Sequence, residues 1–299
     1  MDEATFLAAL RRLPLHPGAA NLRDDTATLA GLTITTDTIV EGTHFLATDP
    51  PGDVAWKLLA TNLSDLAAKG ATPEGVLLNY LLSDDIWDSA FLAGLDAALR
   101  HFACPLLGGD TVTLPAKAPR ILTLTAIGRD AAAPPRSGAK AGDALWVTGT
   151  IGDAGAGLAI AQGETGPTEL LAAYRRPRPR LAEGRVLAPI VHAMMDVSDG
   201  LLIDASRMAV ASGLAVTIDL AAVPLSGACR TFRGDDRAAR LAATTAGDDY
   251  QLLFAAAPDL APPVPATRIG SFMPGTGLTL THAGEHIPLP PRLGFEHAA

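Results

Sequence analysis

The sequence is short of cysteine, of aromatic side chains and of long apolar runs. Its 299 residues hold two cysteines, Cys104 and Cys229, which lie far apart and lack metal-ligand spacing. This argues against a disulfide framework or a zinc site, so both thiols are expected to be small buried hydrophobes. No apolar run approaches the roughly 18 residues that a spanning helix needs, and the N-terminus is acidic where a signal peptide is basic. We therefore expect a cytoplasmic protein that does not associate with membranes.

The chain also lacks an excess of positive charge. It has 23 Lys and Arg against 32 Asp and Glu, a formal net charge of −9. A non-specific grip on nucleic acid needs a positive field over the phosphates, so no nucleic-acid partner is expected. An acidic protein can still bind phosphates where metal ions intervene.

Hydrophobic residues make up 48% of the chain, although aromatics make up only 5%. The excess is Ala, Leu and Val spread among charges, a composition typical of Ala-rich helices packed on sheets. The length exceeds the roughly 250 residues at which single cores stop growing, so two domains are expected. Residues 131–135 (AAAPP) interrupt no periodic pattern, and the boundary is placed there, between residues 1–133 and 134–299.

The first candidate site lies in residues 34–45 (ITTDTIVEGTHF). A β-branched run at residues 32–36 predicts a strand, which is expected to end where Thr35, Thr36 and Asp37 stand. Open sheets keep their ligands at strand ends. Taken alone, the pattern also fits a Thr-rich strand followed by a solvated turn.

Two more acidic positions belong to the first half. Asp24 and Asp25 stand just before the strand, and side-chain alternation predicts that one faces the site and the other faces away. Asp65 lies in a predicted helix, residues 53–71, three positions after Asn62 on a face beside the apolar stripe. A surface acid is the plain interpretation of Asp65, and an acid held against a buried stripe is the functional one.

Glycines accompany the next candidates. Residues 105–107 predict a short buried strand that ends at Gly109 and Asp110, where glycine lets a ligand approach the backbone. Residues 149–157 (GTIGDAGAG) form a glycine-rich link between a strand and a helix, a geometry that can bind an anion. This string is neither a Walker loop nor a clean Rossmann fingerprint, so a plain structural turn fits it equally well.

The motif Asp196-Val197-Ser198-Asp199 precedes a helix predicted to run through about Ala211. Capping of that helix would explain Ser198 or Asp199, because the helix dipole favours negative charge at its N-terminus. Capping does not explain Asp196 as well.

Several acids at loops, strand ends and an apolar helix face need a counter-charge if they converge. Two unit charges about 4 Å apart repel by ~4 kcal/mol at an effective dielectric of 20, and nothing basic in the same motifs is expected to cancel this. Mg²⁺ takes carboxylate oxygens and completes its shell with water and phosphates. The pattern therefore indicates phosphate chemistry on a nucleotide. The acids concerned are Asp25, Asp37, Asp65, Asp110, Asp196 and Asp199.

Seven strings stand in a familiar order: TTDTIVEGTHF, WKLLATNLSDLAAKGATP, GGDT, RSGAKAGD, VTGTIGDAGAGL, DVSDGL and GDDYQLLF. They resemble the thiamine-monophosphate kinase family, in the superfamily of aminoimidazole ribonucleotide synthetase, selenophosphate synthetase and a hydrogenase-maturation protein. The match runs from about Asp24 to Phe254, with a looser echo at Gly294-Phe295. The strings NLSDLAAKGA and DVSDGL are typical of the superfamily, and TTDT with EGTHF indicates the kinase.

The resemblance implies a fold and a reaction. The fold has an N-terminal α+β domain that binds metal and ATP and pairs its sheet with a second subunit in a homodimer, followed by a C-terminal α/β domain. The reaction is ATP-dependent phosphorylation of thiamine monophosphate to thiamine diphosphate with several Mg²⁺ ions. The acceptor phosphate has a second pKa near 6, as a phosphorylated side chain does, so no catalytic acid or base is expected and the transfer is direct and in line.

The resemblance also implies roles for individual residues, in three groups. The metal ligands are Asp25, Thr35, Thr36, Asp37, Asp65, Asp110, Asp196 and Asp199. The ATP contacts are Gly109, Asp110, Arg136 and Ser198. The substrate contacts are His44, Asp248 and Phe295.

The sequence departs from the family pattern in three places. Leu22-Arg23 replaces a glycine before the first acids, which leaves Asp24 as an alternative to Asp25. Asp248 replaces a glutamate, and Phe295 replaces Tyr or Trp.

The alternatives are the sister enzymes and a non-catalytic nucleotide-binding module. Selenophosphate synthetase needs a reactive Cys or selenocysteine near its N-terminus, whereas the first cysteine here is Cys104. The hydrogenase-maturation relative carries a C-terminal cysteine, and this chain ends in Ala299. A non-catalytic module would be expected to lose the metal acids, nearly all of which are present.

Overall fold

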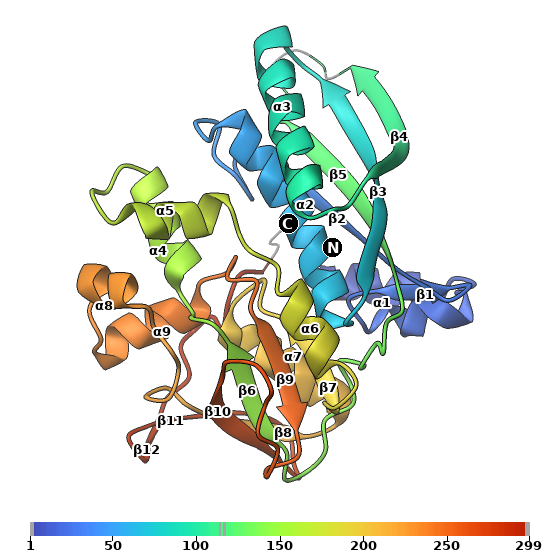
Figure 1. Ribbon diagram of the computed structural model, residues 1–299. Helices are drawn as coiled ribbons and strands as arrows, with labels where there is room; N and C mark the ends of the chain where they lie inside the picture. Colours follow the sequence, from blue (N-terminus) through green and yellow to red (C-terminus); the bar gives the residue numbers. More distant parts are fainter. Residues whose placement is uncertain (1–2, 114, 116–117, 297–299) are drawn as a thin grey trace.

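The computed structural model describes residues 3–113, 115 and 118–296, which form two β-sheets with helices packed on them (Figure 1). The first sheet has the strand order β1-β2-β5-β3-β4, antiparallel except for the parallel pair β3 and β4. Its strands are β1 (Ala27–Leu29), β2 (Leu32–Val40), β3 (Thr72–Leu82), β4 (Leu106–Thr113) and β5 (Ile121–Arg129).

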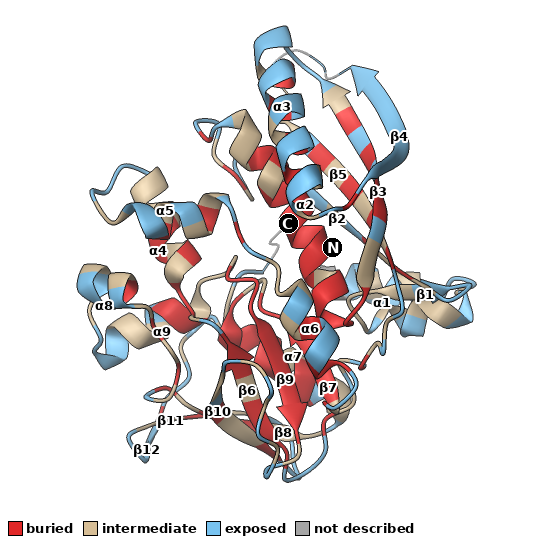
Figure 2. Ribbon diagram, viewed as in Figure 1, coloured by how far each residue is buried: buried red, intermediate tan, exposed pale blue. Residues whose placement is uncertain are grey.

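Two helices cover one face of this sheet, namely α2 (Pro51–Ala68) and α3 (Asp85–His101). Their apolar stripes meet the inward residues of β3 and β5 in one core, to which Phe91 and Leu95 belong. The helices approach each other very closely at Gly94, where a Cβ atom would lie 2.2 Å from the Cα of Gly52. The opposite face of the sheet is left open, and all of β4 is exposed (Figure 2).

The second sheet has the strand order β12-β11-β8-β10-β6-β9-β7. Every residue of β9 is buried, because α7 covers one face of the sheet and α6 the other. Alternation along β9 places Leu253 in the core beneath α7 and Phe254 in the core beneath α6. The strands are β6 (Ala144–Thr148), β7 (Ala193–Asp196), β8 (Ala215–Asp219), β9 (Leu252–Ala256), β10 (Ala266–Met273), β11 (Gly277–His282) and β12 (Glu285–Ile287).

The remaining helices lie around this second sheet, apart from the N-terminal α1 and η1. Helix α7 ends at Ser212, and its C-cap Gly213 adopts a positive φ of 67°, a conformation that favours glycine. The helices are α1 (Glu3–Leu10), η1 (Pro17–Leu22), α4 (Asp153–Ala161), α5 (Thr168–Arg175), α6 (Leu181–Leu187), α7 (Leu201–Ser212), α8 (Gly227–Arg233) and α9 (Arg237–Thr245).

Helix α2 belongs to both halves of the molecule. Its residues Leu58 and Leu63 lie in the core of the first sheet, whereas Ala67 and Ala68 pack with α6, β7 and β9 of the second. Gly184 of α6 lies so close to this end of α2 that a Cβ atom there would be 2.0 Å from the Ala67 carbonyl oxygen. A single helix therefore carries residues from one sheet to the other.

The predicted mixed class, helices packed on sheets in two parts, is confirmed. The boundary at residues 133 and 134 stays a prediction. Two strand predictions are wrong. Strand β2 does not end at Thr36 but continues to Val40, because the β-branched run resumes after Asp37. Strand β4 is not a buried strand that ends before the glycines; it runs through Asp110 along the exposed edge of the sheet.

Within the described part of the chain, no helix is long and apolar enough to cross a membrane.

Candidate functional site

The first acid pair lies against two cations. Lys69, one residue past the end of α2, donates a hydrogen bond to Asp24 Oδ1, and its Nζ lies 3.4 Å from Asp25 Oδ2. Arg136 donates to Asp25 Oδ1. The prediction that one acid faces away is therefore wrong, since both bind the same ammonium group. The expectation that no basic residue in the motifs offsets the acids is also wrong, because Lys69 belongs to one motif and Arg136 to another.

The turn before these acids adopts positive φ angles, although it lacks the glycine of the family pattern. Three successive residues, Ala20, Asn21 and Leu22, adopt positive φ angles of 47°, 54° and 52°. Positive φ is unfavourable for residues with a Cβ atom. Here Arg11 donates hydrogen bonds to the carbonyl oxygens of Asn21 and Leu22 and ties the turn to the end of α1.

The next acids lie between β2 and α2. The Thr35 hydroxyl donates to Asp65 Oδ2, and Asn62 Oδ1 accepts the backbone N–H of Asp37 at 3.1 Å. Asn62 is fully buried, so the face of α2 predicted to hold Asn62 and Asp65 does turn inward toward β2. The acid of this helix is held at the sheet rather than in solvent.

The pKa values of these carboxyl groups are shifted in opposite directions, downward for Asp25 and upward for Asp37 and Asp65. Burial would raise the pKa of Asp25, but the charges of Lys69 and Arg136 outweigh it and keep this pKa below the usual range. Burial, with the charges of Asp25 and Asp199, raises the pKa of Asp37 to about 6. Burial, with the charge of Asp37 first among its neighbours, raises the pKa of Asp65 well above its ordinary value. These acids therefore lie within electrostatic reach of one another.

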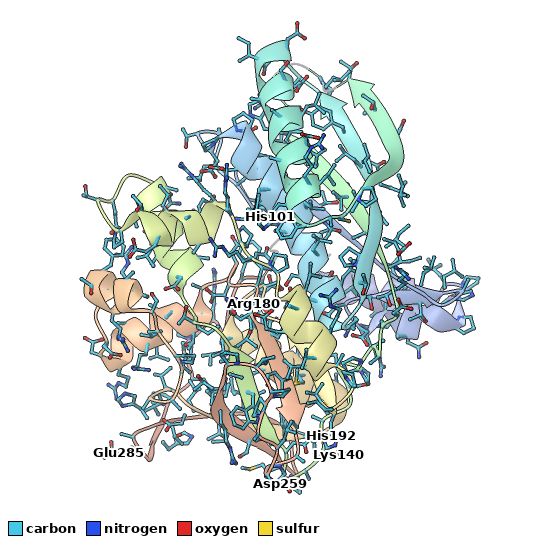
Figure 3. All side chains as sticks on the ribbon, viewed as in Figure 1. His101, Lys140, Arg180, His192, Asp259 and Glu285 are labelled. Carbon is cyan, nitrogen blue, oxygen red and sulfur yellow. The ribbon has the colours of Figure 1, made fainter. Side chains whose placement is uncertain are left out.

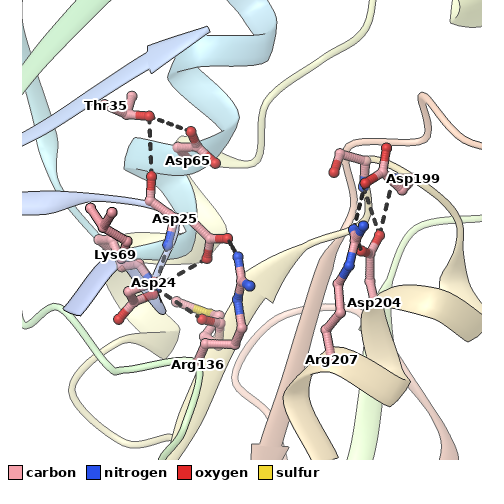
Figure 4. A network of polar contacts seen from close by, with 12 residues as sticks. Asp24, Asp25, Thr35, Asp65, Lys69, Arg136, Asp199, Asp204 and Arg207 are labelled. Carbon is pink, nitrogen blue, oxygen red and sulfur yellow. Dashed lines mark hydrogen bonds and ion pairs between the residues drawn. The ribbon is translucent and has the colours of Figure 1, made fainter. Parts of the chain in front are cut away.

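The second half supplies the facing acids. Asp196 ends β7 and is 4% exposed, and burial, with the charge of Asp25, raises its pKa to about 8. The Asp199 carboxylate binds Arg207, which also binds the fully buried Asp204. Figure 4 shows these contacts opposite those of Asp25 and Lys69.

Neither Ser198 nor Asp199 caps helix α7. Its N-cap is Gly200, and no side chain caps it there. Asp204, in the first turn, instead accepts the backbone N–H groups of both Ser198 and Asp199 at 3.1 Å. This fixes the loop while leaving the Ser198 and Asp199 side chains for other partners.

The three predicted substrate residues come together beside this loop. The rings of His44 and Phe295 are 6.5 Å apart in an edge-to-face arrangement, and the Phe295 N–H donates to the Asp199 carbonyl oxygen at 2.8 Å. Asp248 donates its own N–H to the Ser198 carbonyl oxygen at 2.7 Å. Lys57 joins the two sides, since its Nζ donates to the His44 carbonyl oxygen and to Asp248 Oδ2.

Three predicted residues are not brought into this group. Thr36 projects from the other face of β2, where its hydroxyl contacts the Leu124 carbonyl oxygen and Thr125. Gly109 and Asp110 lie on β4, three strands away from β2, a separation of about 14 Å. Cross-strand pairing aligns Asp110 with Asn79, Thr123 and Thr38, which share the open face of the sheet.

The contacts of the glycine-rich loop at residues 149–157 favour a structural turn over an anion-binding loop. Asp249, buried, accepts the backbone N–H of Gly152 with both carboxylate oxygens, at 3.0 and 2.9 Å. The loop N–H at the start of α4 is thus already satisfied by a carboxylate of the chain itself. Arg180, labelled in Figure 3, lies beside this loop and donates to Gln251 Oε1 at 2.8 Å.

The carboxylate oxygens of these acids are ligands that suit a hard cation, but the carboxylates do not surround a single point. In residues 3–113, 115 and 118–296, no three His, Cys, Asp or Glu side chains are close enough together to hold one ion. Asp25 Oδ2 is buried and accepts no hydrogen bond among these residues. The Lys69 ammonium lies 3.4 Å from this oxygen without a hydrogen bond, so the oxygen already faces positive charge, and the oxygen-only set of ligands suits Mg²⁺.

Sequence reasoning missed the cations and the fixing residues of this site. They are Lys57, Lys69, Asp204, Arg207 and Tyr250. Lys57 and Lys69 stand inside the quoted helix motif next to its apolar stripe, and this position was the only sequence signal that pointed to their burial.

Comparison with known proteins accounts for both halves of the chain. The AIR synthase related protein family matches with its N-terminal domain at residues 23–129 and its C-terminal domain at residues 140–263. The thiamine-monophosphate kinase of Salmonella typhimurium is 42% identical over 233 residues, 75% of this chain and 70% of that protein. The thiamine-monophosphate kinase of Caulobacter vibrioides is 38% identical over 310 residues, 94% of this chain and 86% of that protein. A solved structure described as AaThiL complexed with AMPPCP and TMP superposes with a TM-score of 0.87 at 28% identity, over 99% of this chain and 97% of that one.

Proposed function

Because this chain belongs to the thiamine-monophosphate kinase family, we propose that it transfers the γ-phosphoryl group of ATP to thiamine monophosphate and forms thiamine diphosphate. Membership confirms the resemblance found in the sequence motifs. One observation carries the proposal: acids from β2, α2, β7 and the loop after it share one electrostatic environment, next to His44, Asp248 and Phe295. Curated relatives that are kinases favour this reaction over those of the sister enzymes.

The cation of the site is proposed to be Mg²⁺. The residues that would hold it are the carboxylates of Asp25, Asp37, Asp65, Asp196 and Asp199, with the Thr35 hydroxyl beside them. Bound Mg²⁺ supplies positive charge that offsets the repulsion between the phosphates of ATP and of the acceptor.

The chain's own residues then position two polyanions rather than move a proton. Thiamine monophosphate is largely dianionic near pH 7, since the second pKa of a phosphate monoester is about 6. No general base is needed, and the transfer is proposed to be direct. Arg136 keeps a buried Nε without a hydrogen-bond partner among the described residues, and it is proposed to contact ATP with the donors that Asp25 does not use.

The thiamine side is proposed to lie at His44, Phe295 and Asp248. The thiazolium ring is a cation, and a carboxylate beside two aromatic rings suits it electrostatically. The Asp248 side chain is 30% exposed, so one edge of it remains open to a ligand.

We further propose that the chain works as a homodimer through the open face of its first sheet. That face and its edge strand expose large apolar side chains: Leu77, Leu106, Leu107, Val112 and Ile121. An uncovered apolar sheet face beside an exposed edge strand favours pairing with a second copy. Asp110 lies on this face and Gly109 beside it on the edge strand, both too far from Asp37 to act with it in one chain.

The test is an assay of purified protein with ATP, Mg²⁺ and thiamine monophosphate that follows thiamine diphosphate. Formation of thiamine diphosphate, dependent on Mg²⁺, is the expected result. Absence of this product, together with turnover of another phosphate monoester, would contradict the proposed substrate. A rapid-quench experiment with labelled ATP adds the mechanism, because a phosphorylated protein intermediate would rule out direct transfer.

A further inference from the structure

Lys57 is a buried cation that the phosphoryl-transfer chemistry does not use. It lies in the second turn of α2, and its side chain is only 3% exposed. Its Nζ lies 2.9 Å from the His44 carbonyl oxygen, 2.7 Å from Asp248 Oδ2 and 4.1 Å from the centre of the Tyr174 ring. Two of the three donors of this ammonium group are hydrogen-bonded, and a cation–π contact with Tyr174 adds to them.

The three partners come from separate parts of the chain. His44 lies in the turn after β2, Tyr174 in α5, and Asp248 in the loop before β9. Each partner is fixed independently. His44 Nδ1 accepts the Val40 N–H, the Tyr174 hydroxyl donates to the buried Asp49, and the Tyr250 hydroxyl donates to Asp248 Oδ1.

Asp248 depends most on this contact. Its φ is +68°, an unfavourable value for a residue with a Cβ atom, so the loop needs outside contacts to hold it. The Tyr250 hydroxyl that binds Asp248 also lies within electrostatic reach of Asp37 and Asp196, and Lys57 is the cation that pairs with Asp248 among the described residues. Without Lys57, repulsion from those acids would favour rotation of Asp248 away from the site.

We propose that Lys57 is a positioning residue that sets the distance between His44 and Asp248 and thereby determines affinity for thiamine monophosphate, but not for ATP. The inference rests on the proposed function, because it takes His44 and Asp248 as the two walls of the thiamine subsite. It adds a residue that touches neither substrate and acts on one of them.

Lys57→Met tests this, since methionine has similar length and no charge. We expect KM for thiamine monophosphate, and its Kd by titration calorimetry, to rise at least tenfold. KM for ATP is expected to stay within about twofold of wild type. If Lys57 acts through Asp248, the double variant with Asp248→Asn binds thiamine monophosphate no worse than the weaker of the two single variants.

Arg176→Ala is the matched control. Arg176 also links the segment after α5 to α2, through an ion pair with Asp53 and a cation–π contact with Trp56. Its loss is expected to leave both KM values within about twofold. If Arg176→Ala raises KM for thiamine monophosphate as much as Lys57→Met does, Lys57 acts only by holding the two segments together and the inference fails.

The other possible outcomes also test the role of Lys57. A parallel rise of both KM values, or additive losses in the double variant, would overturn the role of Lys57 in the thiamine subsite. If Lys57→Met does not fold, as judged by its far-UV circular dichroism, Lys57→Gln takes its place with the same expectations. Wild-type protein that neither binds nor phosphorylates thiamine monophosphate would contradict the proposed function itself, and the inference with it.

Discussion

At the scale of one residue, Asp196 shows how the protonation state of a single buried carboxyl group affects the stability of the protein. It is buried at the end of β7, and no ion pair is formed by it within the part of the chain that the structure describes. Burial, with the charge of Asp25, raises its pKa to about 8 from an ordinary 3.8. The folded protein therefore binds a proton here that the unfolded chain releases near pH 4.

This shift predicts a pH dependence of stability in Mg²⁺-free buffer. A folded-state pKa above the unfolded value contributes stability at low pH, which is lost as the pH rises from about 4 to about 8. Asp196→Asn removes the charge, so the variant is expected to be more stable than wild type at pH 8, by up to about 5 kcal/mol. The advantage should shrink toward pH 5. Urea unfolding at both pH values measures it.

Two comparisons accompany this prediction. Asp96→Asn replaces an exposed acid on α3 and should not change the difference between pH 5 and pH 8 in this way. Mg²⁺ is expected to stabilise wild type at pH 8, by about 2.7 kcal/mol at 100 times its Kd, and to stabilise Asp196→Asn less. Parallel stability curves for wild type and Asp196→Asn would contradict the raised pKa.

The sequence indicates which acidic residues belong to the site, but it does not indicate which residues contact them. The sequence singles out Asp37 at the end of a predicted strand, Asp65 beside an apolar stripe, and Asp196 before a predicted helix whose capping does not explain it. Lys57 and Lys69 stand in the same helix motif and were not identified. A long cationic side chain beside an apolar stripe usually extends to solvent, and only the packing of both sheets on α2 prevents this here.

At the scale of an element, α2 connects the two cores and depends on a close approach by α6. Gly184→Ala would place a Cβ atom 2.0 Å from the Ala67 carbonyl oxygen. We expect it to lower the free energy of unfolding by about 1–3 kcal/mol, as overpacking does, although alanine is the better helix former by about 1 kcal/mol. Urea or thermal unfolding of the variant measures the loss.

Gly227→Ala provides the control for this substitution. Gly227 begins α8, and nothing lies within 4 Å of a Cβ atom built on it. This variant is expected to be as stable as wild type or slightly more stable. Equal stabilities for both variants would show that α6 can move away from α2 without loss.

The helix and strand predictions succeeded where the pattern was long and failed where it was short. The apolar spacing of the sequence predicts a helix over residues 84–101, and α3 matches this range closely, because its apolar stripe repeats over four turns and Asp84 caps it. Strand β4 was misjudged, because three apolar residues cannot distinguish a buried strand from an exposed one. Its exposure follows from its place at the edge of the sheet, which local sequence does not encode.

At the scale of the whole molecule, the separation of Asp110 from Asp37 predicts that two copies share the site. Asp37→Asn and Asp110→Asn are each expected to abolish turnover. If one copy supplies Asp37 and the other Asp110, mixing the two variants gives hybrid dimers that each contain one intact site. Random mixing makes half of the dimers hybrid, so activity should return to about a quarter of wild type. The measurement is kinase activity after the two variants are unfolded and refolded together.

The same mixture distinguishes the alternatives. No recovery, with hybrid dimers present, would place both acids in the same site of one chain. Light scattering coupled to gel filtration gives the mass in solution, and a monomeric wild type would contradict the dimer itself. Leu107→Glu, on the exposed edge strand, is expected to shift that mass toward the monomer.

Helix α2 has a further consequence, for how this chain can change over evolution. Lys57, Asn62, Asp65 and Lys69 are carried on it and on its cap, at a fixed rise of about 1.5 Å per residue. The length of the helix thus fixes the distance between the thiamine side and the acid pair. One inserted residue would rotate the two ends by about 100° relative to each other. A single substitution along α2 changes the contacts of one side chain, whereas a change in its length would misplace one end of the site as a whole.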